Sequence, residues 1–148
     1  MYTRILIATD GSELARRGLD HGLALARRLD ADVTIVTVTE PTLPTASATT
    51  AAWVPTFDPT EIDNAKSAYA KQVLDEASKA AEAAGVRATT VHVPNRYPAE
   101  GIVDAAEERG SNLIVIASHG RRGLGRLLLG SQATEVLTHS NIPVLVIK

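Results

Sequence analysis

Five short apolar segments alternate with four segments of helical periodicity along this chain of 148 residues, and this alternation limits the fold more than any other feature. Two of the apolar segments are continuous, which is typical of strands that are covered on both faces. Strands that alternate with helices are joined by right-handed crossovers into a parallel sheet with helices on both sides. We therefore expect a three-layer α/β sandwich whose strands are residues 4–9, 32–38, 87–93, 112–118 and 143–148.

The four intervening segments place apolar residues on one helical face, and capping residues mark their ends. The predicted boundaries are Ser12 for the start of the first helix, Thr60 and Gly85 for the second, Pro98 and Gly110 for the third, and Ser131 and Pro143 for the fourth. The predicted apolar faces include Ala15, Leu19, Leu23, Ala26 and Leu29 in the first helix, Ala65, Tyr69, Val73, Ala77, Ala80 and Ala84 in the second, and Ala133, Val136 and Leu137 in the fourth. No linker or repeat interrupts the pattern, so residues 1–148 are expected to form a single domain.

The composition argues against several classes of function. The formal net charge is −2, so no overall field indicates a nucleic acid or membrane partner. The chain has no cysteine and only four scattered histidines, and we predict no disulfide and no metal site. No apolar run approaches the roughly 20 residues of a membrane span, and the chain starts with a strand rather than a signal peptide. We expect a soluble cytoplasmic protein that binds neither nucleic acid nor membrane.

Residues 39–60 break the regular alternation of strands and helices. This segment carries four prolines and seven threonines, and it holds the single Trp and the single Phe of the chain, Trp53 and Phe57. A loop of this length in a compact domain is usually functional or mobile. We expect it to act as a lid over the carboxyl ends of the strands.

Ligands of open parallel sheets bind outside the carboxyl ends of the strands, near the point where the strand order reverses. The glycine-rich stretch 117–132 leaves one of these ends and reaches the predicted fourth helix at Gly130 and Ser131. A helix amino end offers N–H groups and a positive dipole end to a phosphate, and glycine lets the backbone approach the anion. The arginines that could guide or clamp such an anion are Arg121, Arg122 and Arg126.

Other glycine motifs fit this stretch less well. Gly125 and Gly130 have the spacing of a Walker A loop, but Ser131 stands where that loop needs its lysine. Gly123 and Gly125 begin a dinucleotide-binding pattern, but its third glycine is replaced by Leu128 and the pattern follows the fourth strand. Three arginines without interleaved aromatic residues are thin support for a nucleic-acid surface.

Two stretches of the chain form a more specific pattern. The first strand leads directly into Asp10-Gly11-Ser12 in "ILIATDGS", and the chain ends in "NLIVIASHGRRGLGRLLLGSQATEVLTHSNIPVLVIK". With this pattern the chain resembles the universal stress protein family over its whole length. The ATP-binding branch of that family carries Gly, two residues, Gly, nine residues, Gly and then Ser or Thr. Gly120, Gly130 and Ser131 match this signature, and Ala117 stands in place of its first glycine.

The resemblance implies the adenine nucleotide alpha-hydrolase-like fold with strand order 3-2-1-4-5, and ATP, with Mg²⁺ bridging its phosphates, as the ligand. It places Thr9 and Asp10 beside the base and ribose, and Val38 beside adenine. Gly130, Ser131 and Gln132 would hold the outer phosphates through their N–H groups and the Ser131 hydroxyl. The nucleotide-binding residues that it implies are Ala8, Thr9, Asp10, Val38, Ala117, Gly120, Arg121, Arg122, Gly123, Gly130, Ser131 and Gln132.

Structural roles compete with these assignments. Ser131 is also a favoured N-cap, and Asp10 also suits a residue that begins a turn. The methyl group of Ala117 could crowd the ribose or a phosphate. We expect Gly130→Asp to abolish nucleotide binding and to leave the fold intact, because its carboxylate would repel a phosphate. His119 has no carboxylate or nucleophile beside it in the sequence, so we assign no catalytic residue.

The family resemblance favours a stress-response protein that binds ATP or a related adenine nucleotide and acts as a regulatory dimer. A slow ATPase and a dimeric scaffold without bound nucleotide remain alternatives. We expect the homodimer to form through the C-terminal strand 143–148, which is an edge strand in the implied order. The sequence does not identify the downstream protein partner.

Overall fold

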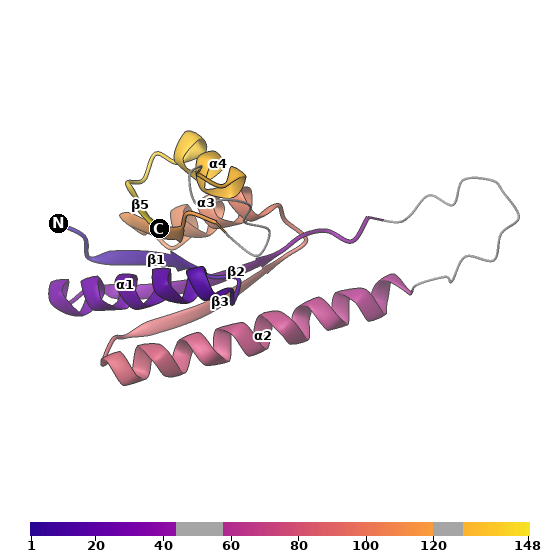
Figure 1. Cartoon of the computed structure of the whole chain (residues 1–148), viewed down its shortest axis with the longest axis horizontal. Helices are drawn as coiled ribbons and strands as arrows, with labels where there is room; N and C mark the ends of the chain where they lie inside the picture. Colours follow the sequence, from indigo (N-terminus) through magenta and orange to yellow (C-terminus); the bar gives the residue numbers. More distant parts are fainter. Residues whose placement is uncertain (44–57, 120–128) are drawn as a thin grey trace, which may run out of the picture.

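A parallel sheet forms the middle layer of the protein (Figure 1). The computed structural model describes residues 1–43, 58–119 and 129–148. The strands within these residues are β1 (Arg4–Ala8), β2 (Asp32–Thr39), β3 (Ala88–Pro94), β4 (Leu113–Ala117) and β5 (Val144–Ile147). They pair in the order β3-β2-β1-β4-β5, and every pair is parallel, which confirms the predicted order.

Two helices cover each face of the sheet (Figure 1). They are α1 (Glu13–Leu29) and α2 (Pro59–Ala84) on one face, and α3 (Pro98–Glu108) and α4 (Ser131–His139) on the other. The sheet separates two apolar clusters, because successive side chains of a strand point to opposite faces. Ile5 and Ile7 pack beneath α1 and α2, whereas Leu6 packs beneath α3 and α4. The three-layer architecture is therefore confirmed.

The predicted caps of α1 and α2 are largely confirmed. The Ser12 hydroxyl accepts a hydrogen bond from the Ala15 N–H at the start of α1. Gly85 ends α2 with a left-handed φ of 67°. Helix α2 begins one residue earlier than predicted, because the Asp58 carboxylate accepts from the Thr60 N–H and the ring of Pro59 suits the first helical position.

The predicted apolar face of α2 is partly wrong. The buried residues of this helix are Ala70, Val73, Leu74, Ala77 and Ala81, whereas Ala65 and Tyr69 are exposed. The 26 residues of α2 span about 39 Å, but the seven residues of β3 span only about 23 Å. The first turns of α2 therefore extend beyond the sheet (Figure 1), where there is little apolar surface for them to cover. Leu29 and Leu137, predicted on the apolar faces of α1 and α4, are 40% and 43% exposed.

The central strand β1 is joined to β4 at its amino end through one amide side chain. The Asn112 Oδ1 atom accepts from the N–H groups of Thr3 and Arg4, each at 3.1 Å. Its Nδ2 atom donates to the Met1 carbonyl oxygen at 3.3 Å. The chain start is thereby held to a residue more than 100 positions away.

Strand β5 is an edge of the sheet, as predicted. The carbonyl oxygens of Pro143 and Ile147 accept from N–H groups next to and within β4. Backbone groups alternate in direction along a strand, so Val144 and Val146 direct their N–H and C=O groups away from β4. Leu145 is 37% exposed on this edge strand.

Part of the chain lies outside the described residues. Residues 44–57 belong to it, so the predicted lid and its Trp53 and Phe57 stay a prediction. The helices in the described parts of the chain are all too short or too polar to cross a lipid bilayer.

Candidate functional site

The strand order reverses between β1 and β4. These strands are neighbours in the sheet, but the helices that follow them, α1 and α4, lie on opposite faces. The two connections therefore diverge at the carboxyl ends of β1 and β4, and a crevice for a ligand forms at such a point in open α/β sheets.

The turn from β1 to α1 forms one side of this point. The Asp10 carboxylate accepts from the Ser12 N–H at 2.9 Å, and the Thr9 hydroxyl accepts from the Gly11 N–H at 3.3 Å. Gly11 has a φ of 79°, in the left-handed region that glycine adopts most easily. The Asp10 carboxylate therefore makes the contact expected of a residue that begins a turn. The turn presents the backbone of residues 9–12 at the end of β1.

Two residues that the sequence analysis did not assign to the site fix this turn from outside. The Thr37 hydroxyl of β2 donates to the Thr9 carbonyl oxygen at 2.8 Å. The Tyr69 hydroxyl of α2 donates to the Asp10 carbonyl oxygen at 2.9 Å. Thr37 could have been found from the sequence, because it is a hydroxyl residue within an apolar strand. The contact of Tyr69 joins residues 59 positions apart, and no local sequence pattern indicates it.

The start of α4 forms the other side. The Gly130 N–H donates to the Ser118 carbonyl oxygen at 2.8 Å, which holds the helix start against the end of β4. A Cβ atom on residue 130 would lie 2.6 Å from that same oxygen. Glycine is therefore required here by close backbone approach. The predicted effect of Gly130→Asp stays a prediction, but any side chain at this position would also push the two segments apart, so loss of binding in this variant would not report on phosphate repulsion alone.

Ser131 does not cap α4, so the N-cap interpretation is wrong. Gly130 is the N-cap residue, no side chain makes a capping hydrogen bond, and Ser131 is the first helical residue with an exposed side chain. The first N–H groups of a helix have no partner within it, and the positive end of the helix dipole lies there. Ser131 thus adds an exposed hydroxyl to a backbone surface that favours anions.

Gln132 has a structural contact. Its Oε1 atom accepts from the Ala99 N–H at 3.1 Å, and this bond links the start of α4 to the start of α3. The side chain therefore serves the packing of the two helices. A role toward phosphate would come from the backbone N–H of Gln132.

Three further residues of the predicted set line the strand ends with their backbone while their side chains are packed. The Ala117 methyl lies 3.8 Å from the position a Cβ atom would take on Gly18, so it faces α1. Val38 packs against Gly101 of α3, where a Cβ atom would come within 2.8 Å of a Val38 methyl. Ala8 is buried beneath α3 and α4. The expectation that the Ala117 methyl crowds a nucleotide is not supported, because the methyl packs against a helix.

Four residues of the predicted set lie outside the described residues: Gly120, Arg121, Arg122 and Gly123. Within the described part of the chain, no group of three or more His, Asp or Glu side chains could hold a metal ion. His119 lies beside Gly130 at the start of α4, and its Nδ1 atom is 3.1 Å from the buried Ser118 hydroxyl.

His92, near the carboxyl end of β3, has a perturbed pKa. Burial lowers the pKa of His92 below its usual value of 6.5. The His92 Nε2 atom lies 2.8 Å from the Thr39 hydroxyl. The pair joins β3 to β2, so β1 lies between it and the point where the connections after β1 and β4 diverge.

The strand order and the division of the helices between two faces define a doubly wound α/β protein. A model described as "Universal stress protein family" matches residues 1–148. The chain belongs to the universal stress protein family, as the sequence resemblance predicted.

Relatives and solved structures agree with this assignment. Universal stress protein YxiE of Bacillus subtilis is 34% identical over 149 residues, and the match covers 100% of both chains. The solved structure of MJ0577 from Methanocaldococcus jannaschii has a TM-score of 0.81 at 29% identity, covering 100% of this chain and 96% of that one. A universal stress protein from Archaeoglobus fulgidus in complex with dAMP has a TM-score of 0.70 at 26% identity, covering 99% and 98%. The neighbours share the adenine nucleotide alpha-hydrolase-like fold that was predicted.

Proposed function

We propose that this protein binds ATP or a related adenine nucleotide between the β1–α1 turn and the start of α4, and that the bound nucleotide regulates a dimer. The observation that carries the proposal is the start of α4, where Gly130 is fixed against Ser118 and Ser131 stands exposed at the positive end of the helix. The dAMP complex of the Archaeoglobus fulgidus relative supports an adenine nucleotide as the ligand.

The described residues fit the two ends of a nucleotide. Thr9 and Asp10 present backbone atoms and a carboxylate to the base and ribose, and Val38 adds backbone atoms next to them. The N–H groups of Ser131 and Gln132, together with the Ser131 hydroxyl, suit the outer phosphates. Mg²⁺ would bind to the phosphates and water, as it does where the protein supplies few ligands.

A regulatory role requires that nucleotide binding differ between two states of the protein. The proposed site lies at the carboxyl end of β4, and β5 pairs with β4 as the edge of the sheet. Pairing of β5 with the same strand of a second copy would use the outward-facing groups of Val144 and Val146 and form a closed two-fold assembly. The site and this edge are thus joined through a single strand.

Calorimetric titration with adenosine, AMP, dAMP and ATP tests the ligand. We expect saturable binding of the nucleotides, and tighter binding of ATP in the presence of Mg²⁺. Mass spectrometry of material extracted from freshly purified protein provides an independent reading of the ligand. Absence of binding by all four compounds would contradict the proposal and would favour the scaffold without nucleotide. Release of ADP and phosphate by purified protein, absent in a Ser131→Asp variant, would favour the ATPase instead.

Light scattering of wild type and of a Val146→Pro variant tests the dimer. Proline removes the outward N–H of Val146 and leaves the bonds that join β5 to β4. We expect a wild-type dimer at micromolar concentration and a shift of the variant toward monomer. A wild-type monomer at about 100 μM, a generous concentration for a specific interface, would overturn the dimer.

A further inference from the structure

The amino-terminal part of α2 is held to the candidate site by hydrogen bonds rather than by burial. No residue of Pro59–Tyr69 is buried, and the buried positions of α2 begin at Ala70. Helix segments with few buried contacts open at low free energy. The order of this part of α2 therefore depends on the polar contacts that it makes.

Lys66 makes the first of these contacts. Its Nζ atom donates to the Glu40 carbonyl oxygen and to the Thr42 hydroxyl, both at 2.8 Å. The Thr42 hydroxyl in turn donates to the Asp63 carboxylate at 2.7 Å. These bonds fasten the chain that leaves β2 to the amino-terminal turns of α2.

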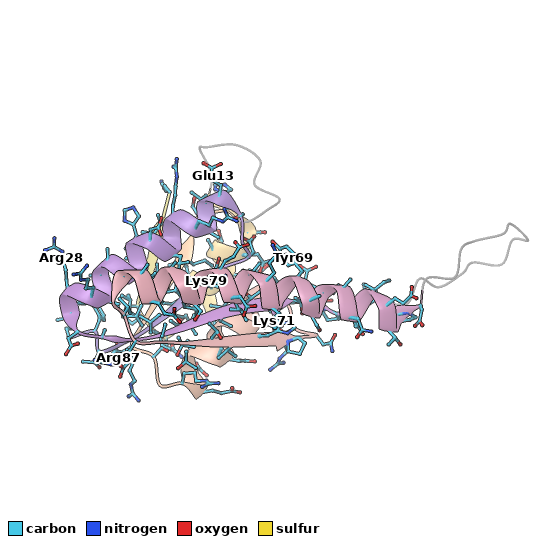
Figure 2. All side chains as sticks on the ribbon, turned by 90° about the horizontal axis from the view of Figure 1, so that it is seen from below. Glu13, Arg28, Tyr69, Lys71, Lys79 and Arg87 are labelled. Atoms are coloured by element: carbon cyan, nitrogen blue, oxygen red, sulfur yellow. The ribbon has the colours of Figure 1, made fainter. Side chains whose placement is uncertain are left out.

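Tyr69, one turn further along α2, makes the second contact. Its hydroxyl donates to the Asp10 carbonyl oxygen, as described above. Figure 2 shows Tyr69 on the side of α2 nearer to α1. A Cβ atom on Gly11 would lie 2.8 Å from both the Tyr69 hydroxyl and a Val73 methyl, so the turn fits closely against this side of α2. Helix α2 thus contacts both the turn that follows β1, through Tyr69, and the chain that leaves β2, through Lys66.

We infer that the Tyr69 hydroxyl is a positioning group for the nucleotide site and couples nucleotide occupancy to the order of the amino-terminal part of α2. This inference rests on the proposed function, in which the turn at Asp10 contacts the base and ribose. If a nucleotide binds more tightly to the turn in the conformation that Tyr69 holds, then bound nucleotide stabilises the hydrogen bond between the Tyr69 hydroxyl and the Asp10 carbonyl oxygen. By thermodynamic reciprocity, the Tyr69 contact strengthens nucleotide binding by the same factor.

Tyr69→Phe isolates the hydroxyl, because the rest of the side chain is retained. Removal of one hydrogen bond that positions a group corresponds to about a threefold to tenfold loss of AMP affinity. Tyr97→Phe is the matched control, because Tyr97 is 53% exposed and its side chain makes no capping bond to α3. The control variant is expected to bind AMP as wild type does.

Hydrogen exchange of the backbone amides of residues 63–73 provides a readout that a merely structural role would not move. AMP is expected to slow exchange of these amides in wild type and in Tyr97→Phe, and to have little effect on them in Tyr69→Phe. Thermal unfolding without nucleotide, with midpoints close to wild type for both variants, establishes that the variants are folded. Failure of wild type to bind adenosine, AMP, dAMP and ATP alike would overturn the proposed function and this inference with it; if AMP alone fails to bind, the tightest binder of the other three replaces it in both measurements. If wild type and Tyr69→Phe bind AMP with equal affinity and show equal slowing of exchange, this inference alone is overturned. Loss of the fold in Tyr69→Phe would also overturn it, because the hydroxyl would then hold the fold rather than position the site.

Discussion

Ser131→Asp should change the stability of the fold and the affinity for nucleotide in opposite directions. Ser131 is the first residue of α4 and its side chain is exposed. A carboxylate in the first turn of a helix interacts favourably with the dipole and stabilises the folded state by about 0.3–1 kcal/mol. The same carboxylate would lie beside the position proposed for the outer phosphates, where it repels them. We therefore expect a protein that is slightly more stable and binds nucleotide more weakly.

The size of the loss follows from the distance between the charges. At about 6 Å, two unit charges repel by about 0.7 kcal/mol with the dielectric constant of water, and by about 2.8 kcal/mol with the effective value of about 20 that is typical near a protein surface. These energies correspond to about threefold and hundredfold losses of affinity per unit of phosphate charge. ATP should lose more affinity than AMP, because its outer phosphates lie nearer to α4, and adenosine should lose none.

Calorimetry with adenosine, AMP and ATP measures this ranking, and denaturant unfolding measures the stability. Ser131→Asn is the matched control, since it has nearly the same shape without the charge. The difference between the two variants should shrink at high salt, because ions screen exposed charges. Equal ATP affinity in both variants, or an equal loss for adenosine and ATP, would refute the placement of phosphates at the start of α4.

Three other substitutions test the packing described above. Gly11→Ala should destabilise the protein by about 1–3 kcal/mol more than Gly85→Ala in denaturant unfolding, because both residues have positive φ but only the first meets other atoms within 4 Å; equal losses would contradict the close fit of the turn against α2. Ala117→Gly should lower stability by about 1–2 kcal/mol and leave ATP affinity unchanged, because the methyl packs against α1; tighter binding in calorimetry would restore the crowding hypothesis. Burial lowers the pKa of His92, so its contribution to stability is present above pH 6.5 and is lost as the pH falls through its folded-state pKa. His92→Gln should therefore lose less stability than wild type between pH 7 and pH 5 in thermal unfolding, and parallel losses would show that other groups are responsible.

The strands and most helix boundaries could be predicted because their signals are local. Ser12 caps α1 through a bond to a residue three positions away, and Gly85 ends α2 through its own backbone conformation. The strand order came from the family resemblance, since periodicity alone does not order parallel strands.

The contacts that shape the candidate site could not be predicted in the same way. Tyr69 was assigned to an apolar face because its spacing fits one, but the sheet ends before it and its hydroxyl reaches Asp10 instead. Gln132 was assigned to phosphate through its backbone N–H, and the contact of its side chain with the start of α3 was not predicted. Both outcomes depend on segments that are distant in the sequence and meet only in the folded chain.

The position of β1 in the sheet decides when the sheet can be completed during synthesis of the chain. This strand is made first, yet its two neighbours are β2, which follows within 30 residues, and β4, which begins at Leu113. Until Leu113 and Asn112 leave the ribosome, Ile5, Leu6 and Ile7 have one unpaired edge. A truncated chain that ends after β3 would present this apolar edge to the β4 segment of another molecule. In two full-length chains, exchange of the carboxyl-terminal third would pair the β1 edge of each molecule with β4 of the other.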